Sequence, residues 1–527
     1  MPAGTDDGGR RVQDSATFRT PRVEPRAEPP APWWPVLLIA AAGGALRLAG
    51  LGRESLWVDE GYTASLVRLG PAAYIDNVLH TIRNILPPLY FALMHYWTAL
   101  AGTSEVALRL PSALAGTAAI VLIHRVALAG VGRRAALIAA VLLAFSPFHL
   151  WFSQEARPYE LLALLYLASL HLLVTVLAGP GAMHPTTSPV TSPVIGLGVI
   201  DALMLYTHHH ATMLIAAQVV YVAVRGVSGT LDRAAIRRWL TASAVGAVVS
   251  IPWLLLFLNQ LGKVNEFPWL SRPTAATLYG TVVTFAGSGP ALACFVVLLL
   301  AGGLSRHLGP RPDAGPYLLL WVAFLVPLLG TFTYAVFFAP VFGAKYVIAT
   351  SLPLLVLVAD GASRLGDLLA RRARRGVPGR PVSAIAAGAA ALITLAAMAP
   401  TVYAHVSRIE KEQWREVTAW VEADSAPGDL VLFNAGYTLA SGFETYAHRT
   451  DLDTRPFPLD SADFATVPDG AQLGTLATLT AGRQHAWVVY SQTHDAHLTI
   501  AEALSALSAD AVCHDYVGVS ACRYTLR

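Results

Sequence analysis

Two adjacent carboxylates, Asp59 and Glu60, follow directly after the first apolar stretch of the chain. Trp57 and Tyr62 flank the pair, as aromatic residues do where a chain meets a membrane surface. Placing a charged side chain near an apolar medium costs free energy, so such a residue is usually paired with an opposite charge or takes part in binding or catalysis. A carboxylate made more basic by a low-dielectric surface can take the proton of a hydroxyl. We therefore predict catalytic roles for Asp59, as general base, and for Glu60; a solvated acidic pair is the alternative.

A second motif, WFSQEARPY at residues 151–159, carries Glu155 and Arg157. The simplest interpretation is a local ion pair that closes a short loop between two helices. Arg157 can equally bind a phosphate, because a guanidinium offers several donors in a fixed fork. We count Glu155 as a third catalytic candidate and Arg157 as a phosphate-binding candidate.

Histidines provide further candidates, three of them consecutive at residues 208–210. On a helix, consecutive side chains point in different directions, so at most one or two of them could share a metal ion. We favour hydrogen bonding of His208 and His209 to a phosphate or a sugar, and His80 is a candidate for the same cavity. Whether the acidic candidates also hold a divalent cation is left open, and no other cofactor is expected.

Basic residues at the outer ends of apolar stretches form the last group of candidates. Lys345, followed by Tyr346, begins one such stretch, and Arg109 lies near the outer end of another. A lysine in this position can extend its amine to lipid head groups, or it can neutralise a departing lipid phosphate. We predict that Lys345, Tyr346 and Arg109 contribute to phosphate binding.

The composition indicates which kind of protein positions these residues. Of 527 residues, 54% are hydrophobic and only 13% are charged, and the mean hydropathy is +0.51. Many separate apolar runs approach the ~20 residues that cross a bilayer, which predicts a multi-pass membrane protein surrounded by lipids. The basic clusters are short and lie between apolar runs, so no nucleic-acid partner is expected. Residues 1–30, rich in Arg, Pro, Asp and Glu, are predicted to be a disordered cytoplasmic tail.

We predict an all-α polytopic fold with about 11 transmembrane helices, or 12 if the apolar segment 85–101 also crosses. The predicted spans are residues 33–51, 107–129, 135–152, 160–178, 194–208, 211–225, 239–258, 290–304, 316–338, 344–361 and 383–400. Excluding 85–101 places the Arg clusters between spans on the cytoplasmic side, as the positive-inside rule requires. We therefore interpret 85–101 as a juxtamembrane helix on the outer surface.

This topology collects the acidic, aromatic and histidine motifs on the outer side of the membrane. The predicted transmembrane catalytic domain covers residues 31–400, and its first outer loop covers 52–106. Residues 401–527 are predicted to form a small α/β domain, also outside the cytoplasm. A site at the outer membrane surface follows from this arrangement.

Within the predicted outer domain, residues 430–433 and 486–490 are apolar runs typical of buried strands. Residues 410–422 have helical spacing, with apolar side chains on one face. Cys513 and Cys522 flank a predicted hairpin and could form a disulfide in an oxidising exterior.

The order and spacing of these motifs resemble those of the C-type glycosyltransferases, specifically the bacterial relatives of protein O-mannosyltransferases and of the lipid A aminoarabinose transferase. The matching pieces are Asp59-Glu60, PPLY at 87–90, LRLPSALAG at 108–116, SQEARPY at 153–159, YTH at 206–208, Lys345-Tyr346 and QWREV at 413–417. The resemblance implies a polyprenyl-phosphate sugar donor, transfer with inversion, a site facing away from the cytoplasm, Asp59 as base and Lys345 near the lipid phosphate. One departure is Leu86, where such relatives often have His.

The sequence therefore predicts an integral-membrane glycosyltransferase of the plasma or inner membrane. Its acceptor, a lipid, a glycan or a protein, is left open, as are the sugar and the oligomeric state. Two other classes remain as alternatives. A transporter or flippase of lipid-linked sugars predicts internal repeats and paired broken helices, and neither is evident in the sequence. A non-catalytic membrane protein that binds glycan would not require Asp59.

Overall fold

The computed structural model describes residues 32–80, 86–179, 191–260, 271–308, 314–373, 380–459, 467–491 and 496–527. The predicted tail at residues 1–30 lies outside these ranges. Residues from Trp34 to Arg527 form one compact unit, which contains a helical bundle and, after it, a region with a β-sheet.

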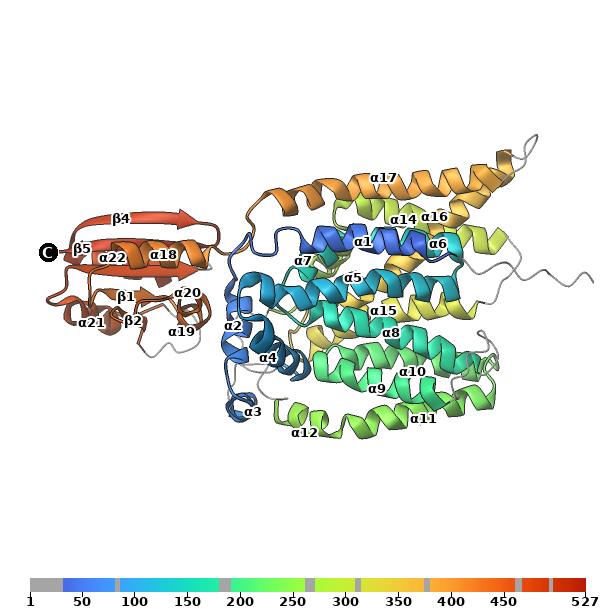
Figure 1. Ribbon diagram of the computed structural model, residues 1–527, viewed down its shortest axis with the longest axis horizontal. Coiled ribbons are helices and arrows are strands. Elements are labelled where there is room, and N and C mark those ends of the chain that lie inside the picture. The colour runs from blue at the N-terminus through green and yellow to red at the C-terminus, as the bar shows by residue number, and fades with distance from the viewer. Residues whose placement is uncertain are drawn as a thin grey trace, which may run out of the picture. The chain divides into compact units, whose positions relative to one another are not determined.

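The bundle consists of apolar helices that run side by side (Figure 1). They are α1 (Trp34–Leu48), α5 (Glu105–Gly130), α6 (Arg133–Ala144), α7 (Pro147–Ser153), α8 (Tyr159–Ala178), α9 (Thr191–Thr207), α10 (Ala211–Val227), α11 (Arg233–Val249), α12 (Ile251–Gln260), α13 (Ala275–Ala286), α14 (Gly289–Leu308), α15 (Gly315–Phe337), α16 (Ser351–Ala373) and α17 (Arg380–Ser407). In lipid, helices satisfy their own backbone hydrogen bonds, which is why apolar runs of this length fold as helices.

The predicted membrane spans all coincide with helices of this bundle. Within the described residues, six helices are long and apolar enough to cross a membrane, and a seventh crossing results if the bent pair α6–α7 is one span. α1, α9 and α10 are apolar but have only 15, 17 and 17 residues. The structure thus confirms a mostly helical chain with membrane spans, and the count of 11 stays a prediction.

Three predicted spans differ in detail from the structure. The span 239–258 is divided between α11 and α12, which are separated by Ser250. The span 135–152 is two helices, α6 and α7, that meet at 56°, because Pro147 has no N–H to continue the first helix and the Ser146 side chain caps the second. The span 344–361 begins later than predicted, since residues 344–347 form turns and helical structure starts only at Ile348. Lys345 therefore lies in a loop rather than at a helix end.

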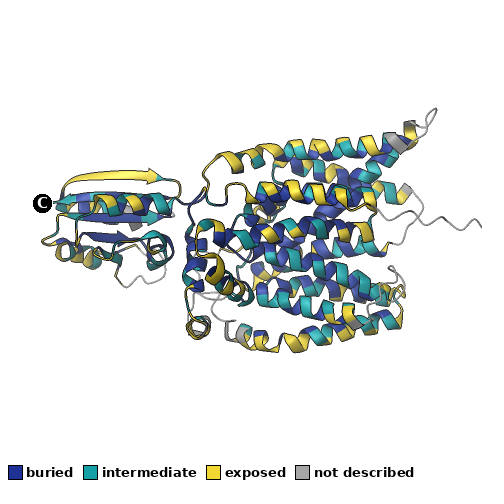
Figure 2. Ribbon diagram, in the orientation of Figure 1, coloured by how far each residue is buried: buried dark blue, intermediate teal, exposed yellow. Residues whose placement is uncertain are grey.

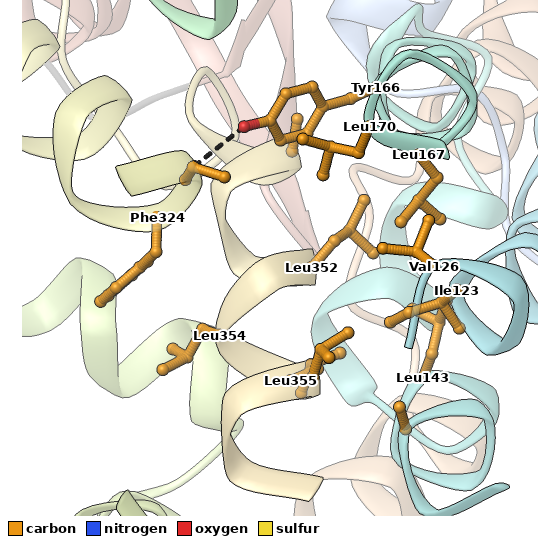
Figure 3. Close-up of a cluster of buried hydrophobic side chains, with 14 of the residues drawn as sticks. Ile123, Val126, Leu143, Tyr166, Leu167, Leu170, Phe324, Leu352, Leu354 and Leu355 are labelled. Atoms are coloured by element: carbon orange, nitrogen blue, oxygen red, sulfur yellow. Dashed lines mark hydrogen bonds between the residues drawn. The ribbon is translucent and has the colours of Figure 1, made fainter. Parts of the chain in front are cut away.

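The core of the bundle is a dense cluster of aliphatic side chains. Figure 3 shows its centre, where side chains from α5, α6, α8, α15 and α16 meet and Tyr166 donates a hydrogen bond to the carbonyl of Ala323 at 3.0 Å. Exposed apolar residues instead cover the outer faces of α14 and α17, where Figure 2 shows exposed stretches along α17. Apolar patches of this extent are typical of a lipid-facing surface.

Between α1 and the long α5, the described residues form three short helices. They are α2 (Val58–Val67), α3 (Pro71–His80) and α4 (Leu89–Ala101). α4 covers most of the predicted juxtamembrane segment 85–101. Its 13 residues span about 20 Å, less than the ~30 Å of a bilayer core. This length agrees with a helix that does not cross, and the side on which it lies stays a prediction.

The region after α17 is a five-stranded sheet with helices. Its elements are α18 (Trp414–Asp424), β1 (Leu430–Phe433), α19 (Gly436–Thr438), the π-helical turn η3 (Leu439–Phe443), α20 (Glu444–Tyr446), β2 (Asp453–Pro456), α21 (Gly470–Thr480), β3 (His485–Ser491), α22 (Ala496–Leu507), β4 (Ser508–Tyr516) and β5 (Val519–Leu526). The strand order is β2-β1-β3-β5-β4. β1 is parallel to β2 and β3, whereas β5 is antiparallel to β3 and β4.

Several sequence predictions for this region are confirmed. The two predicted strands are β1 and β3, and both are buried except at His485 and Tyr490 of β3, which are half-buried. A disulfide joins Cys513 on β4 to Cys522 on β5. The predicted helix 410–422 begins later, at Trp414, because Lys411 and Glu412 turn toward the first helices after α1. The domain limits and the outer location of this region stay predictions.

Candidate active site

The acidic pair lies in the first turn of α2. The helix begins after Trp57, whose backbone has an extended conformation, and the Glu412 carboxylate accepts a hydrogen bond at 3.1 Å from the free backbone N–H of Val58. The positive end of the helix dipole favours carboxylates in this turn. Asp59 and Glu60 are neighbours in sequence, but their surroundings differ.

Glu60 is fully buried and saturated with hydrogen-bond donors. Arg109 holds both oxygens, with Nε at 2.8 Å from Oε1 and Nη2 at 2.6 Å from Oε2. Lys411 Nζ at 3.2 Å and the Ala156 N–H at 2.9 Å also contact Oε1. Burial raises the pKa of Glu60, but the charges of Arg109 and Lys411 outweigh it and bring the pKa to about 2. Glu60 is therefore a permanent anion that anchors the site.

Arg109, on α5, completes this anchor. Its remaining N–H groups donate to the carbonyls of Leu51, Glu54 and Ser55, at 2.7 to 2.9 Å. Together with the bonds to Glu60, these contacts occupy all five donors of the guanidinium. The predicted role of Arg109 in phosphate binding does not fit this geometry, because the side chain instead fixes the loop that enters α2.

Asp59 is ionised and remains reachable, with 22% of its side chain exposed. Lys345 Nζ lies 3.3 Å from Oδ2, and the Tyr437 hydroxyl donates to Oδ1 at 3.0 Å. Burial raises the pKa of Asp59, but the charges of Lys345 and Arg157 lower it by more, so the pKa lies below its ordinary value. The sequence expectation of a more basic carboxylate is therefore wrong for Asp59. The carboxylate is thus held by two side chains that come from distant parts of the chain.

Arg157 and Lys345 supply positive charge around Asp59. Arg157 is buried, and its Nη1 donates to the Asp59 carbonyl at 3.2 Å. Its buried Nε has no hydrogen-bond partner within the described part of the chain. Lys345 Nζ lies 5.5 Å from the ring centre of Trp57 and 5.4 Å from that of Tyr346. A buried, unpaired donor beside a lysine is an arrangement that suits an anionic ligand.

A cavity of about 240 Å³ opens next to these residues. Its lining residues are Trp57, Trp151, Phe152, Glu155, Lys345, Glu410, Lys411 and Glu412. Glu155 accepts a hydrogen bond from Trp57 Nε1 at 3.1 Å, and its other oxygen has no partner among the described residues. Burial raises the pKa of Glu155 to about 7, against the opposing charge of Lys411. The cavity therefore contains two amines and one carboxyl that can change its protonation near neutral pH.

The histidine candidates separate in the structure. The His208 ring lies 6.1 Å from that of Tyr346 and 5.9 Å from that of Tyr159, so it borders the site. His209 instead packs against Trp253 and Phe257 of α12, at 6.1 and 5.2 Å between ring centres. The His80 side chain lies outside the described residues. Among the residues described, no group of three His, Cys, Asp or Glu side chains could hold a metal ion.

Two site residues were missed by sequence reasoning. Tyr437 follows β1, and Lys411 follows α17, so both come from the region after the bundle. Lys411 lies two residues before the QWREV motif, which is the nearest sequence signal for it. No pattern in the sequence distinguishes Tyr437 from the other 17 tyrosines of the chain.

Comparisons with known proteins agree with this architecture. Residues 86–256 match the family described as dolichyl-phosphate-mannose-protein mannosyltransferase. No curated protein matches the sequence. The structure of ArnT from Cupriavidus metallidurans bound to undecaprenyl phosphate is similar, with a TM-score of 0.58 at 16% identity, over 93% of this chain and 97% of that chain.

A second similar structure is AglB from Archaeoglobus fulgidus, an archaeal oligosaccharyltransferase in complex with an inhibitory peptide and a dolichol-phosphate. Its TM-score is 0.57 at 14% identity, and the match covers 93% of this chain and 74% of that chain. The chain thus has the same fold as these two structures, and its residues 86–256 match the mannosyltransferase family named above.

Proposed function

We propose that this protein is an integral-membrane glycosyltransferase that moves a sugar from a polyprenyl-phosphate carrier to an acceptor outside the cytoplasm. The observation that carries the proposal is Asp59, an ionised and partly exposed carboxylate held next to Lys345 and Arg157. The similar structures of ArnT and AglB contain undecaprenyl phosphate and dolichol-phosphate, which are both polyprenyl phosphates. The proposed location is a plasma or inner membrane.

The proposed reaction is a single displacement with inversion. Asp59 takes the proton from an acceptor hydroxyl, and the acceptor oxygen forms a bond to the anomeric carbon of the donor sugar. The bond between that carbon and the phosphate oxygen breaks, and the lipid phosphate leaves with the bonding electrons. Lys345 and the unpaired Nε of Arg157 stabilise the negative charge that develops on this phosphate.

The remaining candidates have supporting roles in this proposal. Glu60 and Arg109 hold α2 and the loop before it, so that Asp59 stays in place. Glu155 lines the cavity, and its raised pKa suits a group that binds a sugar hydroxyl in either protonation state. The Tyr346 ring lies 5.4 Å from Lys345 Nζ, and the His208 ring lies 6.1 Å from that of Tyr346. The acceptor, whether lipid, glycan or protein, is not specified by these contacts.

The test is sugar transfer by purified protein in lipid bilayers from a panel of radiolabelled polyprenyl-phosphate hexoses and pentoses. The variant Asp59→Asn keeps the size of the side chain and removes the base. We expect transfer by the wild type and a loss of about 10²–10⁴-fold in the variant, with binding of the donor lipid nearly unchanged.

Transfer at the wild-type rate by Asp59→Asn would remove Asp59 from the mechanism. Absence of transfer from every donor in the panel would contradict the proposed activity itself. The exposed residue Glu502 on α22 provides a matched control, because Glu502→Gln also replaces a carboxylate by an amide.

A further inference from the structure

The catalytic candidate Asp59 receives a hydrogen bond from the region that follows the bundle. Tyr437 lies in α19, directly after β1, and its hydroxyl donates to Asp59 Oδ1 at 3.0 Å. Burial and the neighbouring charge of Asp59 raise the pKa of Tyr437, so the phenol keeps its proton and acts as the donor. The contact joins residues 378 positions apart in the chain.

The segment that carries Tyr437 is placed by contacts that do not involve its hydroxyl. The backbone of α2 approaches that of η3 so closely at Gly61 that an added Cβ would lie 1.6 Å from the carbonyl oxygen of Ser441. The rings of Tyr62 and Tyr437 lie 6.0 Å apart. The Tyr446 hydroxyl accepts a hydrogen bond from the backbone N–H of Leu56 at 2.6 Å. The position of Tyr437 is therefore fixed independently of the bond to Asp59.

Glu60 has a corresponding contact from the same region. Lys411, four residues after the end of α17, places its Nζ 3.2 Å from Glu60 Oε1 and donates to the Gln154 carbonyl at 2.7 Å. Only 5% of Lys411 is exposed. Each carboxylate of the acidic pair thus has one partner from the chain beyond the bundle.

We propose that the region after α17 is a positioning element of the active site, and that Tyr437 is the positioning residue for Asp59. Its hydroxyl fixes one carboxylate oxygen, which leaves Oδ2 directed at Lys345 on the wall of the cavity. This inference rests on the proposed function, in which Asp59 is the base. It assigns to the sheet region a part in the chemistry of the site, in addition to any part in binding acceptors.

The physical basis is the freedom of a carboxylate. The terminal torsion of aspartate is broad and roughly two-fold, so an unheld carboxylate samples many orientations. A charge-assisted hydrogen bond is among the stronger polar contacts in proteins, and it selects one orientation of the carboxylate. Preorganisation of a reacting group in this way lowers the barrier without altering the ground-state affinity for the donor.

Several charged or titratable groups face Asp59 in addition to the neutral phenol of Tyr437. Lys345 comes from the loop after α15, and Arg157 and Glu155 come from the loop before α8. Tyr159 begins α8, and Glu60 is on α2 itself. Because the Tyr437 hydrogen bond lowers the pKa of Asp59, its removal leaves Lys345 and Arg157 to hold the charge, and the pKa of Asp59 rises.

The first test compares Tyr437→Phe with the wild type in the full-length protein. We expect the turnover number to fall about ten- to a hundredfold, the typical worth of a hydrogen bond to a charged group, while the KM for the donor is unchanged. In the Asp59→Asn background the same change should have no further effect, since Tyr437 acts through Asp59. Tyr279→Phe, at an exposed tyrosine of α13, is the control. Equal losses in both backgrounds would indicate a merely structural role and overturn the inference.

The second test does not require turnover. Infrared difference spectra of the protein in bilayers, with Asp59→Asn as the blank, follow protonation of the Asp59 carboxyl as the pH is lowered. We expect protonation at a higher pH in Tyr437→Phe than in the wild type or in Tyr279→Phe. An unchanged midpoint would overturn the inference. A shifted midpoint in a protein that transfers no sugar would instead sustain the contact and contradict the proposed function.

Discussion

At the scale of single residues, the candidate site residues could be found in the sequence where a charged side chain is unfavourable next to an apolar run. Asp59, Glu155, Arg157 and Lys345 are charged groups next to apolar runs, and the structure gathers all four around one cavity or next to it. Arg109 has the same sequence signature but binds Glu60 and three carbonyls. A pattern of residue types shows that a charge needs a partner, and it does not show whether that partner is a ligand or the protein.

Lys345 provides a test of how charge on the leaving phosphate is stabilised. Lys345→Ala removes the amine that lies near Asp59 and lines the cavity, so we expect transfer to fall by roughly a hundredfold. Lys345→Arg keeps the charge but changes its geometry, so the loss should be much smaller. The measurement is the rate of transfer from a polyprenyl-phosphate sugar at saturating donor. Equal and mild losses of transfer rate in both variants would indicate that the Lys345 amine only contacts lipid head groups and does not act on the leaving phosphate.

Glu155 gives a prediction about pH. Its pKa is raised from 4.5 to about 7 by burial, against the charge of Lys411. Between these two values the folded protein holds a proton that the unfolded chain releases, so the contribution of Glu155 to the free energy of unfolding falls as the pH rises through this window. Glu155→Gln removes the dependence. We expect the Tm of the variant to decline less than that of the wild type over this range.

Thermal unfolding in detergent at several pH values measures this difference. Glu502→Gln, at an exposed position on α22, serves as the control and should follow the wild type. Parallel curves for the wild type and Glu155→Gln would show that the carboxyl does not change its protonation in this range.

At the scale of elements, helices were predictable because apolar runs in lipid have few alternatives to helical structure. Their ends were less predictable. α7 separates from α6 at Pro147. α18 starts only after Glu412, whose carboxylate accepts hydrogen bonds from the backbone N–H of Val58 and the indole N–H of Trp414. These boundaries depend on hydrogen-bond partners far away in the sequence, so the local spacing of apolar residues does not predict them.

The close approach of α2 and η3 gives a prediction at this scale. In Gly61→Ala the new Cβ would overlap the Ser441 carbonyl, so the two backbones must separate. Overpacking of this kind costs typically about 1–3 kcal/mol, and the separation would also withdraw Tyr437 from Asp59. We expect a lower Tm together with reduced transfer.

Gly70→Ala is the matched control for this change. An added Cβ at Gly70 meets no atom within 4 Å, so the control should keep the wild-type Tm and rate. If Gly61→Ala behaved like Gly70→Ala, the packing of η3 on α2 would not be needed for the site.

At the scale of the whole molecule, hydropathy predicted a mostly helical membrane protein followed by a small sheet region. It did not predict that this last region contributes to the site. Tyr437 and Lys411 reach the acidic pair across more than 350 positions of sequence. The only sequence signal near either residue is the QWREV motif after Lys411, and it does not indicate the contact with Glu60. Long-range contacts of this kind arise from the packing of backbones, as at Gly61, rather than from local composition.

The sidedness of the molecule depends on whether 85–101 crosses the membrane. If α4 lies along the outer surface, then α5 runs inward and places Arg133 and Arg134 in the cytoplasm, in agreement with the positive-inside rule. The 13 residues of α4 are too few for a bilayer core.

Reporter fusions should therefore give an exterior signal after residue 104 and a cytoplasmic signal after residue 131. An exterior signal at 131 would add a crossing before α5, reverse every later loop, and place the region after α17 on the opposite side of the membrane from Asp59. Because Tyr437 contacts Asp59, that outcome would contradict the active site as a whole, and not only the count of spans.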